Sequence, residues 1–67
     1  MNLRNFINTC FSDWNIANVV TCGTERGYLK LRYGETFINV FFHLNGDTHW
    51  TGSNVTVYSV KPADDLF

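Results

Sequence analysis

The sequence predicts an α+β fold, in which one N-terminal amphipathic helix packs on one face of a four- to five-stranded antiparallel meander sheet. Three observations predict it. Apolar residues recur with helical period near the N-terminus, and the period changes to two after Trp14. Two dipeptides typical of hairpin turns, Gly34-Glu35 and Asn45-Gly46, then divide the remainder into strands.

The helix is predicted over residues 2–12. Its apolar side chains fall at i, i+3, i+4, i+7 and i+8 and therefore share one face: Leu3, Phe6, Ile7, Cys10 and Phe11. Asn2 is the expected N-cap, and Ser12-Asp13 ends the pattern. A helix of two or three turns is not stable alone in water, so this face is expected to pack on the sheet.

Strands are predicted where residues alternate in polarity or are rich in β-branched side chains: 16–22, 28–33, 36–44, 47–51 and 55–60, with a tail over 61–67. Gly34-Glu35 puts glycine first, as a type II′ turn requires. Asn45-Gly46 suits a turn in which both central residues have positive φ. Counting outwards from the turns predicts the register, with pairs that include Tyr33 opposite Thr36, Leu29 opposite Val40, Phe42 opposite His49 and Phe41 opposite Trp50.

This register divides the sheet into two faces, because successive side chains of a strand point to opposite sides. The aliphatic face is the expected core under the helix: Leu29, Leu31, Ile38, Val40, Phe42 and Leu44. The other face is aromatic and basic: Tyr28, Lys30, Arg32, Phe37, Asn39, Phe41, His43, Thr48 and Trp50. One helix cannot cover both, so the aromatic face is either a second small core or a surface for a partner.

The composition predicts a single globular domain over residues 1–67. The net charge is −1, which argues against duplex-DNA binding driven by phosphate neutralisation and equally against an acidic DNA mimic. No apolar run is long enough to span a membrane, and the first residues lack the apolar centre of a signal peptide. We therefore expect a cytoplasmic protein in which Cys10 and Cys22 are free thiols.

Catalytic and metal-binding patterns are weak. Zinc ligation by Cys10, Cys22, His43 and His49 would need tight pairs of ligands, whereas the cysteines are twelve positions apart and the histidines six. No phosphate-binding glycine loop and no carboxylate pair is visible, and nothing holds a cysteine against a base. The sequence therefore predicts no enzyme, no metal and no cofactor.

The C-terminal residues Asp64, Asp65, Leu66 and Phe67 combine an acidic pair with two terminal hydrophobes. They resemble the short peptides with which bacterial proteins dock on the replication sliding clamp, and the acidic tip of bacterial single-strand-binding proteins. The resemblance implies docking of the tail into an apolar pocket with basic surroundings. Ala63 stands where clamp peptides favour glutamine, and a frayed or back-folded terminus is the other interpretation.

The interpretation that the sequence favours is a small protein-binding module that inhibits or modulates a host protein complex by steric occupation. Small size and absent catalytic motifs are typical of inhibitors encoded by phages or mobile elements. The expected contact residues are on the aromatic face: Tyr28, Lys30, Arg32, Phe37, Phe41 and Trp50. The alternative is single-stranded nucleic-acid binding on the same face. A homodimer paired through the edge formed by Val55 to Val60 is the third hypothesis.

Overall fold

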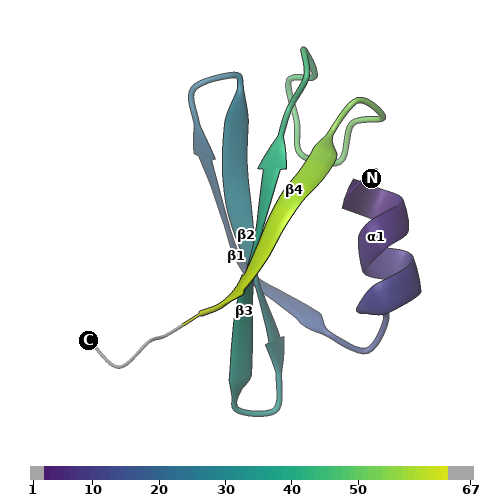
Figure 1. The fold of residues 1–67 in the computed structure, drawn as a ribbon, viewed down its shortest axis with the longest axis vertical. Helices are drawn as coiled ribbons and strands as arrows, with labels where there is room; N and C mark the ends of the chain where they lie inside the picture. The colour runs from purple at the N-terminus through teal and green to yellow at the C-terminus, as the bar shows by residue number, and fades with distance from the viewer. Residues whose placement is uncertain (1–2, 64–67) are drawn as a thin grey trace.

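Figure 1 shows the computed structural model of the protein, which describes residues 3–63. The helix α1 (Leu3–Cys10) precedes four strands: β1 (Asn15–Cys22), β2 (Arg26–Tyr33), β3 (Thr36–His43) and β4 (Thr56–Pro62). The strands form one antiparallel sheet in the order β1-β2-β3-β4, and α1 lies on one side of it. The predicted α+β meander is confirmed, with four strands.

The helix is shorter than predicted and is tied to the sheet at its start. Leu3 is fully buried, and its backbone N–H donates to the carbonyl of Val55, just before β4, at 3.1 Å. Phe6, Ile7 and Phe11 pack against the core. Cys10, predicted on the same face, is instead exposed and is the last residue of α1. The predicted cap Asn2 lies outside the described residues.

The hairpin of β2 and β3 has the predicted register, with Tyr33 opposite Thr36 and Leu29 opposite Val40. Gly34 has φ 63°, which the first position of the turn requires and glycine allows at no steric cost. The predicted aliphatic face is the core: Leu29, Leu31, Val40, Phe42 and Leu44 are buried together with Leu3 and Val55, and Ile38 packs against them.

The predicted strand 47–51 is wrong. Asn45 and Gly46 do form a turn with positive φ, 49° and 94°, closed by a 2.9 Å hydrogen bond from the Asp47 N–H to the Leu44 carbonyl. The chain then continues in turns instead of pairing with β3. The Asp47 carboxylate accepts a hydrogen bond from the Asn54 N–H and so links the two ends of the segment 47–54. We call residues 44–55 the 44–55 loop.

β4 takes the place beside β3 that the loop residues leave free. Val57, Tyr58 and Val60 of β4 are residues enriched in strands, whereas residues 47–51 begin with Asp47, a residue type depleted there. Consequently Phe42 lies opposite Val57, not His49, and Phe41 lies opposite Ser59, not Trp50. A register shift between Phe41 and Phe42 makes Tyr58 the extra residue of a β-bulge.

Candidate functional site

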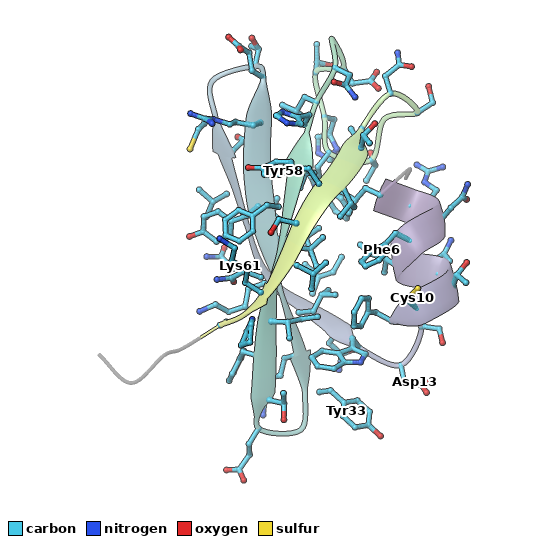
Figure 2. The ribbon with its side chains drawn as sticks, in the orientation of Figure 1. Phe6, Cys10, Asp13, Tyr33, Tyr58 and Lys61 are labelled. Carbon is cyan, nitrogen blue, oxygen red and sulfur yellow. The ribbon has the colours of Figure 1, made fainter. Side chains whose placement is uncertain are left out.

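The sheet has one face without a covering layer in the described part of the chain. We call it the open face and define it by side chains of β2, β3 and β4 that alternate with the buried ones: Arg26, Tyr28, Lys30, Arg32, Phe37, Asn39, Phe41, His43, Tyr58, Ser59 and Lys61. Within residues 3–63, no element packs on it (Figure 1). Figure 2 shows Tyr58 and Lys61 on this side of the sheet and Phe6 and Cys10 on the opposite side, with α1.

Aromatic rings run across three strands of the open face. The Tyr28 ring centroid lies 5.5 Å from that of Phe41, which lies 6.3 Å from that of Tyr58. The His43 ring stacks on Tyr58 at 4.3 Å. Tyr28 and Phe41 are half-buried, while Tyr58 is 50 % exposed. The row therefore has exposed ring surface, and the contacts between its rings hold the rings in place.

The open face also carries most of the positively charged side chains of the protein. Four of the five Lys and Arg residues of the chain are on the open face: Arg26, Lys30, Arg32 and Lys61. The Lys30 ammonium lies 5.5 Å from the Phe37 ring centroid, and the Lys61 ammonium lies 5.8 Å from that of Phe41. None of the four strands contains an Asp or Glu. A chain of net charge −1 thus has one distinctly cationic surface.

Asn39 lies between the two lysines in the register, opposite Lys30 on one side and Lys61 on the other. Its Oδ1 is buried without a hydrogen-bond partner among the described residues. An unsatisfied buried polar atom costs about 1–3 kcal/mol. An apolar residue at this position would avoid that cost.

Trp50 is not on the open face, which corrects the prediction that it lies on the aromatic face opposite Phe41. It packs against the core from the 44–55 loop. There it lines a hollow of about 160 Å³ with Ile7 of α1 and Ile16 of β1. The Arg4 guanidinium donates to the carbonyl of the next residue, Thr51, at 2.7 Å. The loop therefore covers the core beside α1, and Tyr58 extends the aromatic row instead.

We expect Trp50→Ala to lower the free energy of unfolding by ~2 kcal/mol, because a large half-buried ring leaves the core. Urea unfolding followed by circular dichroism measures the effect. A variant of unchanged stability would show that the Trp50 ring is not part of the core packing.

The other five residues predicted for partner contact are on one surface: Tyr28, Lys30, Arg32, Phe37 and Phe41. The sequence does not predict three further residues of this surface: Arg26, Tyr58 and Lys61. Arg26 precedes the predicted strand 28–33, but β2 begins at Arg26, which lies opposite His43. Tyr58 lies in the predicted strand 55–60 and Lys61 in the predicted tail, and only the pairing of β4 with β3 puts them here.

The other residues considered for a catalytic, metal or docking site do not form one in the described part of the chain. No three of the His, Cys, Asp and Glu side chains within residues 3–63 lie close enough to hold a metal ion. The two cysteines are free and exposed, Cys10 on α1 and Cys22 at the end of β1. Asp64, Asp65, Leu66 and Phe67, predicted to dock, lie outside the described residues. For the described chain, α1 is too short and too polar to cross a membrane.

β4 is an edge strand, as the homodimer hypothesis requires. Its bulge at Tyr58 and its Pro62, which lacks a backbone N–H, both disfavour pairing with another strand. The open face is therefore the stronger candidate for a contact surface.

Comparison of the chain with models of protein families, with curated proteins and with solved structures finds no match.

Proposed function

We propose that the protein is a non-enzymatic module that binds single-stranded nucleic acid on the open face. The observation that carries the proposal is the coincidence of rings and charge: the aromatic row and four of the five cationic side chains share one surface whose strands contain no acidic residue. Unpaired bases of any type can stack on aromatic side chains, and cationic side chains bind the phosphates of the backbone. The chemistry of the open face matches both requirements.

Duplex nucleic acid fits this surface less well. The bases of a duplex already stack on one another, so the rings would gain nothing from them. The described acidic residues Asp13, Glu25, Glu35 and Asp47 lie in the turns and loops around the sheet and would repel a wide, rigid polyanion. A flexible single strand can follow the cationic strands between them.

The test is a salt titration of binding to a labelled oligothymidylate of about ten nucleotides, measured by fluorescence anisotropy. Each neutralised phosphate of a single strand contributes about −0.7 to the slope of log K against log salt. Four cations on the open face therefore predict a slope of up to about −3 for the wild type.

Arg32→Ala and Arg4→Ala form a matched pair for this experiment. Each removes a guanidinium that donates to a backbone carbonyl, from Arg32 to Gly34 at 2.8 Å and from Arg4 to Thr51 at 2.7 Å. Only Arg32 is on the open face. Arg32→Ala should reduce the slope by about 0.7 and Arg4→Ala should leave it unchanged. Equal effects of the two, or no binding by the wild type at low salt, would refute the proposal.

The second candidate is the inhibitor of a host protein complex, and the half-exposed Tyr58, which lines a hollow with Arg26, favours it, because Tyr and Arg are enriched at the centres of protein interfaces. The cationic face would then require a partner with an acidic surface. Affinity capture from a host lysate with the wild type and Phe41→Ala in parallel tests it. A protein retained by the wild type alone, with no oligonucleotide binding, would favour this candidate.

A further inference from the structure

The open face is hollowed at one end, where β1, β2, β3 and β4 each contribute to the wall. The hollow measures about 270 Å³ and is lined by Cys22, Arg26, Gly27, Tyr28, Phe41 and Tyr58. Three of these side chains are the rings of the aromatic row, with centroids 5.5 Å and 6.3 Å apart. Gly27 has no side chain and contributes only backbone to the lining.

From this geometry we infer that the hollow holds one unpaired nucleobase against Tyr28, Phe41 and Tyr58, with Arg26 beside its phosphate. The inference rests on the proposed function and specifies where on the open face a base is held. The volume lies just below the ~300 Å³ at which ligand pockets usually begin, which suits one flat heterocycle better than a larger ligand. Three rings around it supply the stacking surface.

A second hollow adjoins the first and shares Cys22 and Arg26 with it. It also includes Glu25 and His43. The Glu25 carboxylate would repel a phosphate placed deep in this second hollow. The phosphate of the bound nucleotide is therefore expected outside the second hollow, against the Arg26 guanidinium, which can donate to two of its oxygens.

The two cysteines make the inference measurable, since one lines the hollow and the other does not. Cys22 forms part of the wall, whereas Cys10 is on α1, on the far side of the sheet, beside Asn5, Phe6 and Thr9. Both are free and exposed, so a maleimide should label both in the unbound protein. A base in the hollow should shield Cys22 and leave Cys10 reactive.

The experiment compares maleimide labelling of the two thiols with an oligothymidylate and with an abasic strand of equal length, each at ten times its own Kd. The oligothymidylate is expected to slow labelling of Cys22 about tenfold and labelling of Cys10 not at all. The abasic strand should bind through its phosphates and leave Cys22 reactive. Cys22→Ser and Cys10→Ser variants assign the two labelling rates.

Tyr58→Ala and Tyr33→Ala provide a matched pair for affinity. Both tyrosines are about half exposed, at 50 % and 56 %, but Tyr33 contacts Trp14 instead of the open face. Tyr58→Ala should weaken oligothymidylate binding about tenfold or more, and Tyr33→Ala should not. If both strands bind but protect Cys22 equally, or if both bind and neither protects it, the base site is overturned and the proposed function stays intact. Failure of both strands to bind would refute the proposed function itself.

Discussion

Phe42→Ala is expected to remove a large part of the protein's free energy of unfolding. Phe42 is the largest fully buried side chain of the described residues. Truncating a core phenylalanine to alanine costs about 3–5 kcal/mol. A chain of this length has a total stability of roughly 3–10 kcal/mol, at about 0.05–0.15 kcal/mol per residue. Circular dichroism with urea titration is the measurement, and a cooperative transition at the wild-type midpoint would contradict the assigned core.

Phe41→Ala, one position earlier, is the control for the same chemical change on the opposite face. Its ring is half-buried and contacts Tyr28 and Tyr58 on the open face. The variant should fold with a loss of about 1 kcal/mol, the scale of one or two aromatic contacts. It should bind oligothymidylate roughly tenfold or more weakly, because one stacking surface is gone. If it loses as much stability as Phe42→Ala does, the open face is a second core.

Gly27→Ala is the second substitution with a large expected effect. Gly27 is buried in β2, and a Cβ there would lie 2.4 Å from the Val20 carbonyl oxygen and 2.9 Å from the Thr21 Cα. Both are backbone atoms of β1, so relief requires the two strands to separate. Overpacking of this kind costs about 1–3 kcal/mol and occasionally more. We expect a loss of at least ~2 kcal/mol in urea unfolding.

Gly23→Ala is the comparison. Gly23 has φ 69°, but a Cβ at this position would meet no atom within 4 Å beyond its chain neighbours, so only the backbone conformation opposes the change. Its cost should be about 1 kcal/mol. Phe42→Leu should not rescue Gly27→Ala, because the closest clash is with backbone. Rescue by Phe42→Leu would show that the ring at 3.2 Å, not β1, limits the space.

The hairpin of β2 and β3 was predictable in detail because local signals agree. Gly34-Glu35 determines a two-residue turn, and strict alternation on both sides leaves one register that buries Leu29, Leu31, Val40 and Phe42 together. A slip by one residue would expose this set and bury Lys30 and Arg32. The five contact residues predicted on this hairpin therefore share a face.

The 44–55 loop was not predictable by the same reasoning. Asn45-Gly46 forms the expected turn, but a turn determines only the direction in which the chain leaves it. Which segment then pairs with β3 is a competition between residues 47–51 and 56–62, decided by β-propensity and by burial of Trp50. The bulge at Tyr58 has no signal in the sequence that counting from turns could use.

Periodicity and turn chemistry over neighbouring residues were enough to predict the α+β class, the short helix and a central hairpin with one aliphatic and one aromatic, basic face. The rings that complete the open face depend on long-range packing. Pairing with β4 brings Tyr58 and Lys61 beside Phe41, and packing of the 44–55 loop removes Trp50 to the core. Both outcomes depend on contacts between residues distant in the chain, and local patterns do not contain the free energies of such contacts.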